Sequence, residues 1–182
     1  MNISREHLEL LSESFRNIDE TTKEIINLEA ILSLPKGTEH FLSDIHGEYE
    51  AFDHILRNGS GVIKEKLKEV FGNRLPKKEL NLLATIIYYP EEKLNLLKKE
   101  FSTAEYKEYQ KILLLRLLEV TQVAARKYTR SKVRKLLPKD FDYIIEELLY
   151  KMQTRDKEDY YEKILENIIE LGAGDKFIIE LS

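Results

Sequence analysis

Apolar residues recur every three or four positions along almost all of this 182-residue chain, which is the spacing of amphipathic helices. One stretch departs from that spacing: residues 39–43 form a short apolar run bounded by a turn and predict a β-strand. A single strand cannot satisfy its own backbone hydrogen bonds, so the run either folds as irregular structure or pairs with strands outside this sequence. We therefore expect a mainly α-helical chain with one or two short strands at most.

Capping residues, prolines and glycines mark the ends of the expected helices. Ser4 is the expected N-cap of the first helix, and Thr21 with Glu24 predicts a capping box at the start of the second. A third helix is expected over residues 48–57, and residues 131–137 either continue or restart the long helix before them. The other expected helices cover residues 62–71, 76–87, 90–97, 103–128, 141–152, 156–171 and 175–182.

Composition narrows the class of protein. Hydrophobic residues make up 42% of the chain and charged residues of both signs 34%, which favours a folded, helix-rich protein. The net charge of −4 gives no general attraction to nucleic acid or to an anionic membrane. The chain has no cysteine, which excludes disulfides, zinc fingers and thiol catalysis. No signal peptide and no apolar run of about 20 residues is present, so we expect a cytoplasmic protein.

The sequence Asp44-Ile45-His46-Gly47 follows the apolar run and precedes the third expected helix. In an extended segment residues two apart point to the same side, so Asp44 and His46 should project together. A carboxylate oxygen beside an imidazole nitrogen suits Mn²⁺, Fe²⁺ or Zn²⁺. Gly47 permits a sharp turn, and the free amides at the helix start favour a phosphate group. Metal and phosphate at such a turn indicate phosphoester hydrolysis.

A simpler interpretation of the same residues remains open. Aspartate is a good N-cap, so Asp44 would only cap the third helix, and His46 would be an ordinary loop histidine.

Longer segments carry a more specific signal. Residues 24–75, EIINLEAILSLPKGTEHFLSDIHGEYEAFDHILRNGSGVIKEKLKEVFGNRL, closely resemble the N-terminal part of the bacterial class III fructose-1,6-bisphosphatases. The segments ATIIYYPEEKL (84–94), KYTRSKVRKLLPKDFDYIIEELLYKM (127–152) and IIELGAGDKFIIELS (168–182) are similar to later parts of the same family. The resemblance covers nearly the whole chain.

This resemblance implies a calcineurin-like metallophosphoesterase, with a β-sandwich flanked by helices and two metal ions at the strand ends. The first motif of that superfamily, D-x-H, maps onto Asp44 and His46 as metal ligands, with Gly47 also matching. The implied reaction removes the 1-phosphate of fructose 1,6-bisphosphate in gluconeogenesis, with Mn²⁺ as the usual metal. The resemblance implies no catalytic residues beyond the metal ligands, and it leaves a homo-oligomer open.

Two other superfamily motifs are missing. G-D-x-x-D-R is absent, since Gly174-Asp175 is followed by Lys-Phe-Ile, and G-N-H is absent, since Gly72-Asn73 is followed by Arg74. We therefore expect an N-terminal portion of a larger α/β enzyme, with the remainder of the enzyme chain as its partner. Residues 1–60 would begin the phosphoesterase domain and residues 61–182 would form a helical insertion. Alone, this portion should be inactive and hold Mn²⁺ weakly or not at all, because catalytic sites supply at least three protein ligands.

Several further residues have both a functional and a structural interpretation. His40 either orients a metal ligand or is structural, and His54 is expected to pack or face solvent, with a substrate role as the alternative. A basic cluster is either a solvated helix face or a site for a phosphorylated ligand. Its members are Arg126, Lys127, Arg130, Lys132, Arg134, Lys135 and Lys139. Tyrosines are expected to pack, among them Tyr88, Tyr89, Tyr106 and Tyr109.

Two other functions compete with the bisphosphatase assignment. The chain could be a self-standing helical interaction module without catalysis, in which Asp44 and His46 serve only as cap and loop. It could also belong to a phosphoesterase that acts on another sugar phosphate.

Overall fold

The computed structural model describes residues 4–36, 39, 41–151 and 157–182, and the chain divides into two compact units. The smaller unit comprises residues 1–37 with Lys127–Thr129, and the larger unit comprises residues 38–126 and 130–182. The expected division into a phosphoesterase start (1–60) and a helical insertion (61–182) is one of enzyme architecture, and it stays a prediction.

The smaller unit contains two helices, α1 (Arg5–Ser14) and α2 (Ile18–Leu32). Ser4 caps α1 as expected, with its side chain accepting from the His7 backbone N–H. The cap predicted for α2 is wrong. That helix begins earlier, at Ile18, and its N-cap is Asn17, whose side chain accepts from the Glu20 backbone N–H at 2.9 Å. Asparagine is among the strongest N-cap residues, and its position three residues before a glutamate outcompetes the later Thr21.

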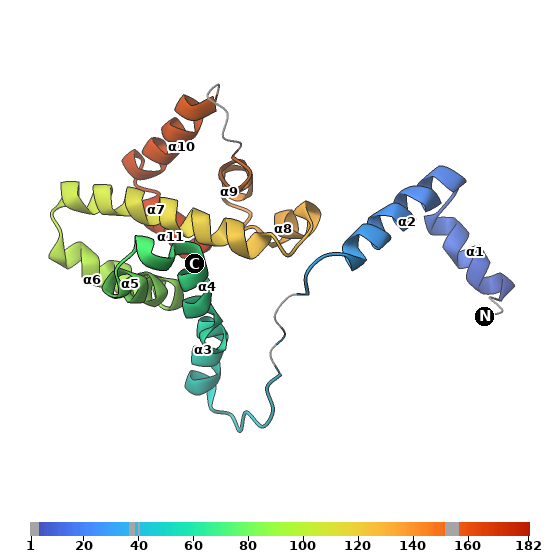
Figure 1. Ribbon diagram of the computed structural model, residues 1–182, viewed down its shortest axis with the longest axis horizontal. Coiled ribbons are helices and arrows are strands. Elements are labelled where there is room, and N and C mark those ends of the chain that lie inside the picture. Colours follow the sequence, from blue (N-terminus) through green and yellow to red (C-terminus); the bar gives the residue numbers. More distant parts are fainter. Residues whose placement is uncertain (1–3, 37–38, 40, 152–156) are drawn as a thin grey trace. The chain divides into compact units, whose positions relative to one another are not determined.

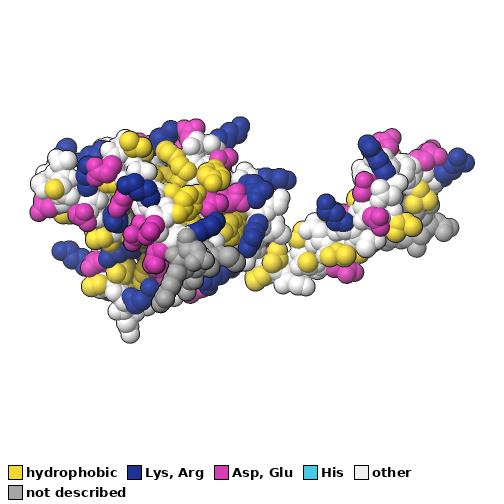
Figure 2. All heavy atoms as spheres, turned by 90° about the horizontal axis from the view of Figure 1, so that it is seen from above, with side chains coloured by type: hydrophobic (Ala, Val, Ile, Leu, Met, Phe, Trp, Pro, Cys, Tyr) yellow, Lys and Arg dark blue, Asp and Glu magenta, His cyan; other side chains and the backbone are white. Residues whose placement is uncertain are grey.

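Both helices of the smaller unit leave their apolar side chains at the surface. None of the described residues in α1 or α2 is buried. Leu8, Leu10, Ile25, Ile26 and Leu28 are all exposed, and hydrophobic side chains are visible on this unit in Figure 2.

The larger unit consists of helices joined by short connections. Pro90 occupies the first turn of its helix as expected, and residues 130–136 form a helix of their own after the long one has ended at Ala125. The elements are α3 (Tyr49–Asn58), the 3₁₀ turn η1 (Gly59–Gly61), α4 (Val62–Phe71), η2 (Gly72–Arg74), α5 (Lys77–Tyr88), α6 (Pro90–Glu100), α7 (Thr103–Ala125), α8 (Arg130–Leu136), α9 (Asp142–Leu149), α10 (Glu158–Glu170) and α11 (Gly174–Leu181).

The core of the larger unit gathers around α7. Figure 1 shows this helix running through the unit, with α6 on one side and α9 and α10 on the other, and α4 and α11 also pack against it. The most deeply buried large side chains come from six helices. They are Leu67, Leu83, Ile86, Leu94, Leu113, Leu114, Leu117, Ile145, Phe177 and Ile178. Burial of these side chains supplies the main stabilising free energy of the unit.

The expected mainly α-helical character is confirmed, but the expected strand is wrong for the residues that can be checked. Glu39 and residues 41–43 are irregular, and the described parts of the chain contain no β-strand. The physical reason is that an isolated strand has no neighbour to pair with inside this chain, so the run is irregular here, and its pairing with strands outside this sequence stays a prediction.

Candidate functional site

The loop that carries the D-x-H sequence is held in an unusual backbone conformation. Asp44, His46 and Gly47 all have positive φ angles, of 62°, 50° and 74°. Aspartate and histidine adopt the left-handed region more readily than most residues, and glycine does so freely. Backbone hydrogen bonds close the turn, from the Glu48 N–H to the Ile45 carbonyl at 3.0 Å and from the Tyr49 N–H to the Gly47 carbonyl at 2.9 Å. The loop is therefore a defined turn between the irregular segment and α3.

This turn brings the two candidate ligands into direct contact. The Nε2 atom of His46 lies 2.7 Å from the Oδ1 atom of Asp44. Both side chains are open to solvent, with exposed fractions of 73% for His46 and 74% for Asp44. The pair was expected to meet because an extended chain repeats every two residues. Instead, two left-handed residues on either side of Ile45 fold the side chains toward each other.

The capping interpretation of Asp44 is wrong. Helix α3 begins at Tyr49 with Glu48 as its N-cap residue, and no side chain caps it. The Asp44 carboxylate contacts His46 instead.

The separation of the two atoms is that of a hydrogen bond, and it is also near the spacing of neighbouring ligands of one metal ion. Two ligand atoms about 2.1 Å from an ion and at right angles lie about 3.0 Å apart, close to the observed separation of Oδ1 and Nε2. A third donor is lacking, because the described residues contain no group of three or more His, Cys, Asp or Glu side chains that could hold a metal. The donor types therefore fit a divalent ion, but they would fill only part of its coordination sphere.

Comparison with known proteins identifies the family of this chain. The family model for Firmicute fructose-1,6-bisphosphatase matches residues 6–182. The chain belongs to this family. No solved structure matches it.

Curated members of the family match nearly the whole chain but extend far beyond it. The fructose-1,6-bisphosphatase class 3 of Alkaliphilus metalliredigens is 58% identical over 177 residues, which are 97% of this chain and 26% of that protein. The protein of the same name from Listeria monocytogenes serotype 4b is 54% identical over 99% of this chain and 27% of its own length. The one from Fusobacterium nucleatum is 51% identical over 100% and 28%. The chain thus spans about a quarter of the length of these bisphosphatases.

Of the remaining candidate site residues, the structure describes Gly47 and His54. His40 lies outside the described residues. Gly47 occupies the turn before α3, as expected, and its φ of 74° explains the need for glycine there. Binding of phosphate at the start of α3 stays a prediction. His54, on α3, pairs through Nδ1 with the Tyr89 hydroxyl, and the two rings stack with centroids 6.0 Å apart.

Part of the basic cluster is engaged within the fold. Arg134 forms a forked hydrogen bond to Glu146, with its Nε atom 3.0 Å from both carboxylate oxygens and its Nη2 atom 2.7 Å from one of them. This bond lowers the pKa of Glu146 and raises that of Arg134. The Arg130 guanidinium lies 4.8 Å from the centre of the Tyr150 ring. On the face that Figure 2 shows, charges of both signs are interspersed over the larger unit.

The named tyrosines pack as expected. Tyr88 and Tyr106 are buried, and the Tyr109 ring stacks on Phe101 with centroids 5.3 Å apart. Burial raises the pKa of Tyr88, Tyr106 and Tyr109. These hydroxyls are therefore protonated near neutral pH.

One feature of the larger unit could not be predicted from the sequence. A cavity of about 550 Å³ lies between α3, α4 and α5, and the polar side chains of Asn58 and Lys64 line it. These two residues lie on consecutive helices, and the packing of α5 against both helices brings Tyr88 to the same cavity. No helix in the described part of the chain is long and apolar enough to cross a membrane.

Proposed function

We propose that this chain forms part of a fructose-1,6-bisphosphatase that removes the 1-phosphate of fructose 1,6-bisphosphate in gluconeogenesis. Family membership supports the reaction, because the curated relatives bear that name. The observation that carries the site is the 2.7 Å contact between Asp44 and His46 on a solvent-exposed, left-handed turn. The match to the bisphosphatase family favours this function over a self-standing interaction module.

We infer that Asp44 and His46 hold one of two Mn²⁺ ions of a calcineurin-like site. When bound, the metal supplies a Lewis acid and an activated water for attack on phosphorus. Asp44 contributes an anionic oxygen, which offsets part of the charge of the cation. His46 contributes Nε2, which must give up its contact with Oδ1 so that both atoms can face the same ion. Ligand atoms must be unprotonated to bind, so acid competes with the metal.

The backbone around the pair has its own part in the proposal. The positive φ of Gly47 lets the chain enter α3 directly, so that the first amides of that helix lie a few residues from the ligands. Those amides carry partial positive charge and would favour the phosphate group of the substrate. Two protein ligands rarely hold a catalytic ion, so we propose that the other ligands come from the part of the relatives' length that this chain does not cover.

The test uses a chimera, in which this chain replaces the matching segment of the Alkaliphilus metalliredigens protein. Phosphate release from fructose 1,6-bisphosphate is measured after chelation and Mn²⁺ replacement. The chimera should be active, and His46→Ala should lower kcat/KM by at least about 100-fold, since even residues that only support a ligand cost 10–100-fold. His7→Ala, at an exposed histidine on α1, is the matched control and should leave activity unchanged.

The outcomes separate the competing functions. Full activity and unchanged Mn²⁺ dependence in His46→Ala would remove the ligand assignment. A chimera that folds and hydrolyses another sugar phosphate faster would replace the substrate but keep the metal site. A folded, inactive chimera would favour the interaction module.

A further inference from the structure

The cavity between α3, α4 and α5 has the size and lining of a small-molecule site. Its volume of about 550 Å³ falls within the range of small-ligand pockets, roughly 300–1,000 Å³. The polar side chains that line it come from all three helices. They are His54, Asn58, Lys64, Asn81, Thr85 and Tyr88.

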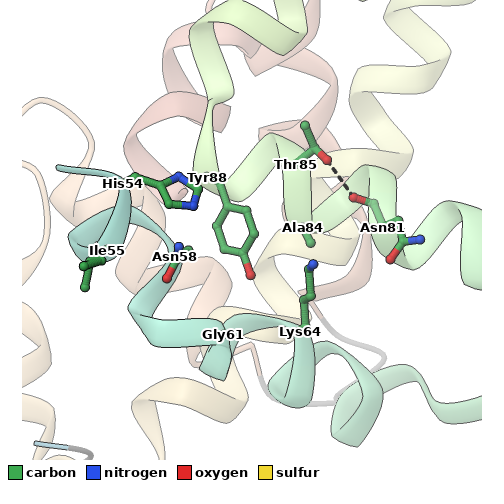
Figure 3. A pocket seen from close by; sticks show the side chains of 9 residues that line it. All are labelled: His54, Ile55, Asn58, Gly61, Lys64, Asn81, Ala84, Thr85 and Tyr88. Atoms are coloured by element: carbon green, nitrogen blue, oxygen red, sulfur yellow. Dashed lines mark hydrogen bonds between the residues drawn. The ribbon is translucent and has the colours of Figure 1, made fainter. Parts of the chain in front are cut away.

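Two buried polar atoms on this lining keep unmet hydrogen-bonding capacity. These atoms are the Tyr88 hydroxyl and the Asn58 Oδ1 atom. Tyr88 is only 9% exposed, and Figure 3 shows its hydroxyl directed into the space between Asn58 and Lys64. Burial raises the pKa of Tyr88, and a hydrogen bond from the Lys64 backbone N–H to the hydroxyl oxygen opposes this, so the hydroxyl keeps its proton near neutral pH and has no acceptor for it. Buried polar atoms of folded proteins nearly always have partners, so an unmatched donor and acceptor in one cavity indicate a missing polar molecule.

The charges around the cavity select for an anion. Lys64 is the charged residue of the lining, and no carboxylate is among the residues that form it. Gly61, at the N-cap of α4, also lines the cavity, and no side chain caps that helix. The first amides of α4 therefore add partial positive charge to that of Lys64.

Neighbouring contacts hold the walls in place. The Thr85 hydroxyl donates to the Asn81 carbonyl oxygen at 2.9 Å, as drawn in Figure 3. His54 is fixed through Nδ1 by the Tyr89 hydroxyl, which leaves its other ring nitrogen for the cavity. A site with fixed walls loses less conformational freedom on binding.

We propose that this cavity binds a small oxyanion that also carries a hydroxyl group, either a phosphate monoester or a hydroxycarboxylate. The oxyanion lies against Lys64 and the start of α4, and it accepts a hydrogen bond from the Tyr88 hydroxyl. The hydroxyl group of the bound molecule donates to Asn58 Oδ1. This site is independent of Asp44 and His46 and does not rest on the proposed phosphatase reaction.

The test is an NMR titration of the purified 182-residue chain with glycerol 3-phosphate, glycerate and inorganic phosphate in separate arms. Binding should move the side-chain amide signals of Asn58 and Asn81 in a saturable way. Lys64→Met and Tyr88→Phe should each weaken binding by about 10-fold or more, because each removes a hydrogen bond to a charged group. Lys68→Met, at an exposed lysine one turn further along α4, is the matched control and should bind like the parent chain.

The three arms distinguish the two sources of the anion. Tighter binding of glycerol 3-phosphate supports the phosphate monoester, and tighter binding of glycerate supports the hydroxycarboxylate. Inorganic phosphate binding as tightly as glycerol 3-phosphate would overturn the role of Asn58. No saturable shift in any arm, or an equal loss in Lys64→Met and Lys68→Met, would overturn the site.

Discussion

Replacing Asp175 with alanine tests how much a buried polar cluster stabilises the larger unit. Asp175 lies in the first turn of α11, and its Oδ1 atom accepts from the Tyr106 hydroxyl at 2.7 Å and from Gln110 Nε2 at 2.6 Å. Tyr106 is 8% exposed and Gln110 is 7% exposed. Lys98 forms an ion pair with the other carboxylate oxygen, Oδ2. One carboxylate therefore satisfies two buried donors on α7 and a partly exposed cation on α6.

The magnitude follows from the two donors. Asp175→Ala leaves the Tyr106 hydroxyl and the Gln110 amide buried without a partner, and each such loss costs about 1–3 kcal/mol. The two losses share one acceptor and do not add fully, so we expect a destabilisation of about 2–4 kcal/mol. For a chain of this size that corresponds to a melting temperature lower by roughly 4–16 °C. The ion pair with Lys98 adds little, because that lysine is substantially exposed.

Urea unfolding followed by circular dichroism measures the effect. Glu170→Ala is the control, since it breaks an exposed ion pair with Lys107 and should cost less than about 1 kcal/mol. Tyr106→Phe should destabilise the parent, whereas in the Asp175→Ala background it should cost nothing further or restore stability, because it removes a donor that has no acceptor. An Asp175→Ala loss no larger than that of Glu170→Ala would refute the reasoning.

Two further predictions concern helix capping and the isolated chain. Ser102 and Glu105 form a capping box at the start of α7, so Ser102→Ala should lower the melting temperature by roughly 2–4 °C. The Ser102 hydroxyl, and then its backbone amide, lower the pKa of Glu105, so this contribution is present above the unfolded pKa of about 4.3 and is lost as pH falls below it. Thermal melts between pH 3 and 7 should show the gap between the two proteins narrowing at the acid end, while the bond from the Glu105 backbone N–H to the Ser102 hydroxyl remains. A constant gap would count against the box. The 182-residue chain alone should release no more phosphate from fructose 1,6-bisphosphate than its His46→Ala variant, and calorimetry should show weak Mn²⁺ binding or none, whereas clear turnover by the parent alone would contradict the need for further ligands.

Features set by a few neighbouring residues were predictable from the sequence. The caps at Ser4 and the start of α6 at Pro90 follow from side chains within one helical turn. The start of α2 was misplaced because two cap signals lie four residues apart and only the stronger one, at Asn17, is used. The helices themselves lie close to their expected positions because the apolar spacing that defines them is also local.

The candidate metal pair could be predicted only in part from the sequence. The residue types and their order indicated that Asp44 and His46 would meet, but the backbone that brings them together is a left-handed turn and not a strand. That difference arises because a strand needs partners far away in the sequence, whereas the turn is closed by hydrogen bonds between adjacent residues.

The sequence by itself determined the helical class, most helix ends and the chemistry available at residues 44–47. Only the tertiary structure decided that the Tyr106 hydroxyl reaches Asp175, 69 residues away, and that Asn58, Lys64 and Tyr88 line one cavity. Capping and periodicity act over about one helical turn, so they can be read along the chain. Contacts between helices depend on how whole faces pack, and no short stretch of sequence specifies that packing.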